Sequence, residues 1–318
     1  MDASVAAKIP IGISSCLLGE KVRFDAGHKR NAYVNGVLSD YFEFHPFCPE
    51  VAIGLGIPRE PIRLVSSAGE IRCVGVKDPK QEFTDSLREA ADGQKSWHKD
   101  LCGYILKKDS PSCGMERVKV FENDMPTRKG SGIYAKTLME NFPYLPVEEE
   151  GRLEDAHLRE NFIQRVYVLH RWKLLAENGL SLADIQSFHA KHKYIFMSHD
   201  QNGAKALGAL VAEGKKNAVD ELAHNYLIAM MDLLKVIASR GNHVNTLQHI
   251  QGYLKKHLDG DDKLELVDVI RRYGDGLVPL VVPITLLKHY FRKYPVDYIA
   301  ESYYLNPHPG ELMLLNYV

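Results

Sequence analysis

The spacing of apolar residues changes near residue 150, and this change constrains the fold more than any other feature. Before it, short apolar runs alternate with segments of helical period. After it, apolar residues recur mainly at intervals of three and four positions. Strand–helix alternation is typical of βαβ units around a parallel sheet, whereas the second pattern is typical of amphipathic helices. We therefore expect two domains, over residues 1–147 and 148–318.

The first domain is predicted to be α/β and Rossmann-like, with a mainly parallel sheet. Its predicted strands span residues 10–15, 42–47, 71–76, 102–107 and 117–122. Its predicted helices span residues 29–41, 80–99 and 131–142. In open sheets of this kind, binding sites form beyond the carboxyl ends of the strands. The acidic run 148–151, which follows two prolines, is the predicted junction with the second domain.

The second domain is predicted to be all-helical. Apolar residues at helical spacing indicate helices at 154–177, 217–239, 243–258, 262–273 and 283–293. Gly179 follows the first of these as a helix stop. Ser181 and Asp184 have the spacing of a capping box, which predicts that another helix begins there.

Three of the five cysteines share one local setting. Cys16, Cys48 and Cys113 each follow a predicted strand, in a loop that contains Gly or Pro. If those strands are parallel neighbours, the three thiols meet at one sheet edge. Three thiolates are one short of closing a cubane iron–sulfur cluster and would leave one iron open. Spacing alone leaves two explanations open, a shared metal or cluster site and ordinary buried cysteines, because no ferredoxin or zinc-finger spacing is present. Cys73 and Cys102, within or at the head of predicted strands, are expected to be structural.

Overall composition narrows the class of protein. The formal net charge is −1, so bulk charge predicts neither nucleic-acid nor membrane binding. No segment approaches the run of about 20 apolar residues that a membrane span needs, and the N-terminus lacks a secretory apolar region. The expected compartment is the cytoplasm, where thiols stay reduced. An odd number of cysteines also argues against a disulfide framework.

Several sequence blocks together resemble a known family. Four blocks in the first domain resemble the TudS-type thiouracil desulfidases over about residues 8–147: residues 13–19, 23–27, 47–59 and 108–114. Residues 150–318 resemble the helical YbgA-like domain, through residues 188–194, 242–243 and 307–311. The fused arrangement resembles the RudS-type desulfidases, which act on 4-thiouridine in tRNA.

The resemblance implies a cofactor and a reaction. It implies a 4Fe–4S cluster with three cysteine ligands, Cys16, Cys48 and Cys113, and one open iron. That iron would act as a Lewis acid toward a soft thiocarbonyl sulfur. The implied reaction is a non-redox desulfidation of 4-thiouridine in tRNA to uridine, with release of sulfide. Three alternatives remain: desulfidation of free thiouracil or thiouridine nucleotides, a zinc-stabilised RNA-binding module without catalysis, and metal-free thiol chemistry at Cys16 or Cys113.

Attack by water on a thiocarbonyl carbon needs a proton acceptor, and the departing groups need donors. The candidates near the cysteine motifs are Glu50, Ser110, Ser112 and Asp25. Arg23 and Arg59 are candidates for holding a phosphate or a uracil oxygen. Each of these residues also has an ordinary explanation, as a solvated side chain or as a cap of a loop or helix.

The second domain is predicted to bind the RNA. Its charges are nearly balanced, so only local basic clusters qualify, at 191–194, 255–257, 271–273 and 292–294. Basic residues beside aromatic rings can pair with phosphates and stack on bases. The named candidate contacts are Lys191, Lys193, Arg271 and Arg272. Each cluster alone is also typical of a solvated helix face, and no second metal site is expected from the histidines. The sequence leaves the oligomeric state open.

Overall fold

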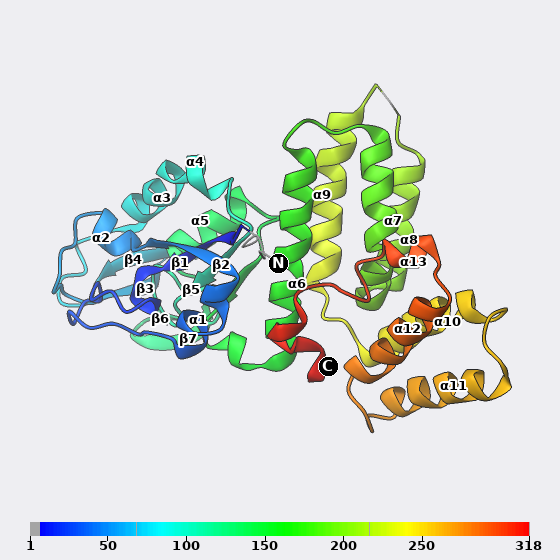
Figure 1. Cartoon of the computed structure of the whole chain (residues 1–318). Helices are drawn as coiled ribbons and strands as arrows, with labels where there is room; N and C mark the ends of the chain where they lie inside the picture. The colour runs from blue at the N-terminus through cyan, green and yellow to red at the C-terminus, as the bar shows by residue number, and fades with distance from the viewer. Residues whose placement is uncertain (1–6, 68, 216, 318) are drawn as a thin grey trace. The chain divides into compact units, whose positions relative to one another are not determined.

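The computed structural model describes residues 7–67, 69–215 and 217–317. The chain separates into two compact units, one up to Glu154 and the other from Asp155 onward (Figure 1). The first unit combines strands with helices and the second is helical. The predicted succession of an α/β domain and an all-α domain is therefore confirmed. No helix within the described ranges has the length and apolar character needed to cross a membrane.

The first sheet of the α/β unit is entirely parallel, in the order β2-β1-β5-β8. β1 pairs with β2 and with β5, and β5 pairs with β8. The strands are β1 (Ile9–Ser14), β2 (Phe42–Phe47), β5 (Gly103–Leu106) and β8 (Val147–Glu149). Three of the predicted strands, at 10–15, 42–47 and 102–107, are therefore neighbours in one parallel sheet.

A second sheet, which the sequence did not indicate, has the order β4-β3-β6-β7. It is mixed, because β3 and β6 are parallel whereas the two outer pairs are antiparallel. Its strands are β3 (Ile62–Ser67), β4 (Glu70–Gly75), β6 (Val118–Glu122) and β7 (Met125–Gly130). The predicted strands at 71–76 and 117–122 belong here and not to the parallel sheet. β7 was missed because five of its six residues are exposed, so it lacks alternation of apolar and polar residues.

The acidic run predicted as the junction is instead part of the α/β unit. Glu148, Glu149 and Glu150 are all buried at the edge of the parallel sheet. Glu148 accepts from the Arg152 guanidinium, and Glu149 accepts from the Met115 N–H at 2.8 Å. Glu150 accepts from the Lys108 N–H and pairs with Lys107. Because each carboxylate accepts a hydrogen bond, and those of Glu149 and Glu150 do so from other segments, the run can be buried in the α/β unit.

The helices of the first unit are α1 (Ala32–Asn35), α2 (Pro49–Ala52), α3 (Thr84–Gly93), α4 (Lys95–His98) and α5 (Ile133–Asn141). The helix predicted at 29–41 is shorter, since Asn31 caps its start and Gly36 ends its first segment. The helix predicted at 80–99 is divided into α3 and α4 at Gln94. The prediction at 131–142 corresponds to α5.

The second unit contains helices α6 to α13: α6 (Ala156–Ala176), α7 (Leu182–His199), α8 (Gln201–Ala212), α9 (Val219–Lys235), α10 (Arg240–Gln251), α11 (Gly260–Gly274), α12 (Val281–Lys293) and α13 (Asp297–Ala300). The capping box of Ser181 and Asp184 is confirmed at the start of α7. Gly179 has a φ of +85°, as a glycine helix stop requires. α8 was not predicted, and Asp200 caps its start by accepting from the Asn202 N–H.

Candidate active site

Three adjacent parallel strands bring the three cysteines to one edge of the sheet. Cys16 lies in the 3-10 turn Ser15–Leu17 directly after β1, and Cys48 lies between β2 and α2. Cys113 lies in the loop that follows β5. All three residues line one cavity of about 270 Å³. Cys73 is instead buried in the apolar core beneath the second sheet, and Cys102 is buried at the head of β5.

The Cys113 loop is fastened to the start of α5. The carbonyls of Pro111, Ser112 and Gly114 accept hydrogen bonds from N–H groups of residues 132–135, at distances of 2.7–3.1 Å. Gly132 makes this approach possible, because a Cβ there would lie 2.5 Å from the Ser112 carbonyl. The Ser110 hydroxyl oxygen also accepts from the Cys113 N–H at 3.1 Å. The position of the Cys113 thiol is therefore set by the helix behind it.

Burial controls the protonation of the thiols. Desolvation raises the pKa of Cys16 to about 11, although the nearby Arg23 and Lys107 oppose the rise. It also raises the pKa of Cys48 and of Cys113 above the usual range. Without a metal, these thiols are protonated at neutral pH and are weak nucleophiles. This disfavours the metal-free thiol alternative, whereas thiolate ligands release their protons when a metal binds.

The three thiols have the chemistry of ligands to an iron–sulfur cluster. In the described part of the chain, no three side chains of His, Cys, Asp or Glu are grouped closely enough to hold one metal ion. A structural zinc site needs four ligands that converge on one point. In a cubane, each thiolate binds a different iron, so the ligands surround a volume. Three thiols on the walls of one cavity fit that requirement.

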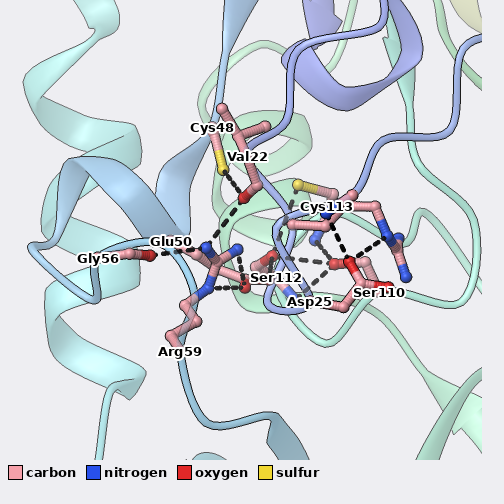
Figure 2. Close-up of polar contacts among 11 residues, drawn as sticks. Val22, Asp25, Cys48, Glu50, Gly56, Arg59, Ser110, Ser112 and Cys113 are labelled. Atoms are coloured by element: carbon pink, nitrogen blue, oxygen red, sulfur yellow. Dashed lines mark hydrogen bonds and ion pairs between the residues drawn. The ribbon is translucent and has the colours of Figure 1, made fainter.

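Glu50 is held in the same cavity by a network of hydrogen bonds (Figure 2). Its Oε2 accepts from Nε and Nη2 of Arg59, at 2.8 and 2.6 Å. Its Oε1 accepts from the Ser112 hydroxyl at 2.6 Å. The Ser112 oxygen lies 2.9 Å from Ser110 Oγ and 3.5 Å from Cys113 Sγ. Because the single Ser112 proton is donated to Glu50, Ser110 donates to Ser112.

Arg59 also lines the cavity, where protein groups hold its guanidinium. Its Nη1 donates to the carbonyls of Val22 and Gly56, at 2.9 and 3.0 Å, in addition to its two bonds to Glu50. The Val22 carbonyl also lies 3.9 Å from Cys48 Sγ. With these donors occupied, Arg59 has little capacity left to hold a phosphate or a uracil oxygen. Its contacts instead fix the carboxylate and the adjoining ligand loop.

The remaining predicted residues of this unit divide between the cavity and its surroundings. Arg23 lines the cavity and pairs with Asp25 at 3.5 Å, but Asp25 itself is half-exposed and is not part of the wall. Lys107 and Lys108 are among the cavity residues that were not predicted. Their signal was present, since they directly follow β5 at the edge where the cysteines converge.

The predicted RNA contacts of the second unit have different surroundings. Lys191 pairs with Glu301 at 3.3 Å, and Lys193 Nζ lies 5.9 Å from the ring centre of Tyr194. Arg271 forms ion pairs with two acidic residues of its own helix segment, Asp268 and Asp275. Arg272 is exposed.

Comparisons with known proteins match both units. A family model described as 2-thiouracil desulfurase matches residues 11–150, and one described as a protein of unknown function, DUF1722, matches residues 193–309. The uncharacterized protein YbgA of Escherichia coli (strain K12) is 30% identical over 151 residues, which cover 47% of this chain and 89% of YbgA. The uncharacterized protein YbbK of Bacillus subtilis (strain 168) is 30% identical over 108 residues, 32% of this chain and 71% of YbbK.

Among solved structures, the 4Fe-4S-dependent thiouracil desulfidase TudS aligns with 25% identity and a TM-score of 0.38. The alignment covers 46% of this chain and 94% of TudS. The two family models lie in succession along the chain, and the match to YbgA spans most of that relative. The chain therefore belongs to the family of YbgA, and its first unit matches the 2-thiouracil desulfurase family model.

Proposed function

We propose that this protein removes sulfur from 4-thiouridine in tRNA by a non-redox, hydrolytic reaction. Water supplies the oxygen of the new carbonyl and two protons, and sulfur leaves as hydrogen sulfide. The observation that carries the proposal is the cavity that joins three thiols to Glu50 and Ser112. The match of residues 11–150 to the 2-thiouracil desulfurase family model supports the same reaction type.

The ligands of the cofactor would be Cys16, Cys48 and Cys113, which fit a 4Fe–4S cluster with three cysteine ligands. When bound, such a cluster supplies an open iron that acts as a Lewis acid toward the soft sulfur of the substrate. Two phenylalanines, Phe24 and Phe47, contribute apolar surface to the cavity wall. In the proposed complex they would contact the pyrimidine ring and limit the access of bulk water.

Glu50 is the residue we assign to proton transfer. Arg59 occupies its Oε2, so Oε1 is the oxygen available to take a proton from the attacking water. The Ser112 hydroxyl, which donates to Oε1, would exchange that bond for one to the water or the substrate. Ser110 holds Ser112 through its own hydroxyl and would complete the proton path. Asp25, outside the cavity wall, would act only through Arg23.

Free thiouracil or a thiouridine nucleotide is the second candidate substrate, because the relatives' family is described by thiouracil. The test is an anaerobic assay of the reconstituted full-length chain, on tRNA that contains 4-thiouridine and on free 4-thiouracil. Iron, protein-bound sulfide and released sulfide are counted in the same samples. We expect a higher kcat/KM on tRNA. Turnover of the free base alone would favour the second candidate, and a zinc protein without iron or turnover would refute the enzyme.

A further inference from the structure

Lys107 is a cation that a buried carboxylate holds at the wall of the cysteine cavity. Its Nζ donates to Oε1 of Glu150 and to the Lys108 carbonyl, the latter at 3.1 Å. Glu150 also accepts from the Lys108 N–H at 2.8 Å, through Oε2. The Lys107 and Glu150 side chains are 13% and 9% exposed. The ammonium is therefore fixed inside the protein and cannot turn freely into solvent.

This ammonium keeps one N–H donor for the contents of the cavity. An ammonium has three N–H donors. In the described part of the chain, the contacts to Glu150 and Lys108 use two of them. Lys107 lines the same cavity as the three cysteines. The third donor is therefore available to a group that binds there.

The ion pair produces a positive field at the nearest cysteine. Lys107 opposes the rise that burial causes in the pKa of Cys16, whereas Glu150 adds to that rise. The effect of Lys107 is the larger of the two. A field of this sign stabilises a thiolate, and it stabilises any other anion at the same place.

A purely structural role explains the pair less well. Burial of an ion pair contributes little to stability, because the loss of hydration offsets the attraction. The ammonium is also not needed to join this edge of the sheet, since β5 and β8 already pair through their backbones. The Glu150 N–H itself donates to the Leu106 carbonyl at 3.1 Å.

The other cations of the cavity are occupied or exposed. Arg59 uses its guanidinium in four hydrogen bonds to protein groups. Arg23 pairs with a carboxylate at 3.5 Å. Lys29 and Lys108 are exposed. Lys107 therefore combines a buried charge with an available donor.

The proposed reaction builds up negative charge in this cavity. Three thiolate ligands would make the cofactor anionic, and the sulfur of the substrate becomes sulfide as it leaves. Few water molecules can solvate these anions there, so a fixed cation stabilises them more than it would in solution.

We propose that the Lys107 ammonium donates its remaining N–H to the substrate sulfur as that sulfur becomes sulfide, and that Glu150 positions the ammonium for this contact. The assignment rests on the proposed function, because sulfide is the product of that reaction. Lys107 is then a catalytic residue and Glu150 a positioning residue.

The test measures the binding of sulfide without turnover. Sodium sulfide is titrated anaerobically, at about pH 8, into the full-length, reconstituted chain, and the change in the absorbance of the cluster gives Kd. Lys107→Met should raise Kd about tenfold or more, because a hydrogen bond between charged groups is lost. Lys107→Arg keeps the charge and the donors, so its Kd should stay within about threefold of the wild type.

A second variant separates this effect from a loss of folding. Lys107→Met leaves the Glu150 carboxylate buried without its cation, whereas Lys107→Met combined with Glu150→Gln removes both charges. The double variant should keep the iron content and the melting temperature of the wild type. It should nevertheless bind sulfide as weakly as Lys107→Met does.

The matched control is Lys29→Met, which removes an exposed cation from the same cavity. Its Kd should stay within about twofold of the wild type. Equal loss of affinity in Lys29→Met and in the double variant would overturn the proposal, because bulk charge would then explain binding. A wild-type Kd in the double variant would overturn it too, as would an iron-loaded wild type that binds no sulfide. Because sulfide is the probe, failure of the reaction on tRNA leaves this result readable.

Discussion

Glu50→Gln separates the proposed proton transfer from the structural role of the same side chain. Glutamine has nearly the same shape, so its carbonyl oxygen can still accept from Arg59 and its amide nitrogen can face Ser112. What the change removes is the negative charge and the basic oxygen. The loss of a general acid or base lowers turnover by about 100- to 10,000-fold.

The same contacts indicate how much Glu50→Gln lowers the free energy of unfolding. Arg59 and Glu50 are 5% and 14% exposed, so the charged guanidinium would remain nearly buried without its counter-ion. Breaking such a pair costs about 3–5 kcal/mol, and retained neutral hydrogen bonds bring Glu50→Gln to the lower end. A domain of ordinary stability, about 5–15 kcal/mol, stays folded after that loss.

The assay compares kcat on 4-thiouridine tRNA at equal iron content, with the absorbance spectrum of the cluster as the check on assembly. Glu60→Gln is the control, since Glu60 is exposed and pairs only at the surface with Lys77. It should retain turnover within about twofold. Wild-type turnover in Glu50→Gln would refute the reasoning, and so would a loss of activity that only parallels a loss of iron.

Arg59→Lys tests the other half of the pair. An ammonium keeps the charge but cannot reproduce the four hydrogen bonds from one guanidinium to Glu50, Val22 and Gly56. We expect kcat to fall about tenfold or more with KM little changed, because Arg59 positions the carboxylate. A raised KM with normal kcat would show instead that Arg59 contacts the substrate.

Two further predictions concern the cofactor and the helical unit. Cys16→Ser should lose both the cluster and activity. Cys73→Ser should keep both and only lower the melting temperature, since Cys73 lies in an apolar core. Equal iron loss in the two variants would contradict the ligand assignment. Burial lowers the pKa of His199 to about 4 and of His243 to about 3, so the unfolded chain takes up protons below pH 6.5 that the folded chain does not. The free energy of unfolding should therefore fall between pH 6.5 and 4, by on the order of 3 kcal/mol per histidine. Burial raises the pKa of Glu160 to about 7, so this residue opposes the fall, but only in part. A melting temperature that is the same at pH 7 and pH 4.5 would contradict the prediction.

The sequence could predict that the three cysteines lie together, because each of them follows a predicted strand of the parallel sheet. Cys16 and Cys48 directly follow apolar runs, and parallel neighbours place such ends together. The sequence could not predict the hydrogen bonds of Arg59. Its bonds to Glu50, Val22 and Gly56 depend on how three loops pack, and no local pattern records that packing.

The errors have a common physical origin. A charge run is read as solvated unless its partners are known, and the partners of Glu148–Glu150 come from Lys107, Met115 and Arg152. A strand is recognised by alternation of apolar and polar residues, and exposed β7 has none. Likewise, each basic segment of the helical unit is typical of a solvated helix face when it is considered alone. Ring stacking such as that of His257 on Tyr294 forms only when the helices pack, so no local pattern predicts it.

The bonding of the Cys113 loop to α5 has a consequence for how the site opens. Gly132, the residue before α5, provides no side-chain cap, and the loop carbonyls accept from the N–H groups at the start of the helix instead. The loop and the first turn of the helix must therefore separate together, as one cooperative unit of local unfolding. Amide hydrogen exchange at residues 132, 133 and 135 would therefore report the release of the Cys113 loop, because these N–H groups donate to its carbonyls. How long the Cys113 loop stays bound therefore depends on how often the first turn of α5 frays.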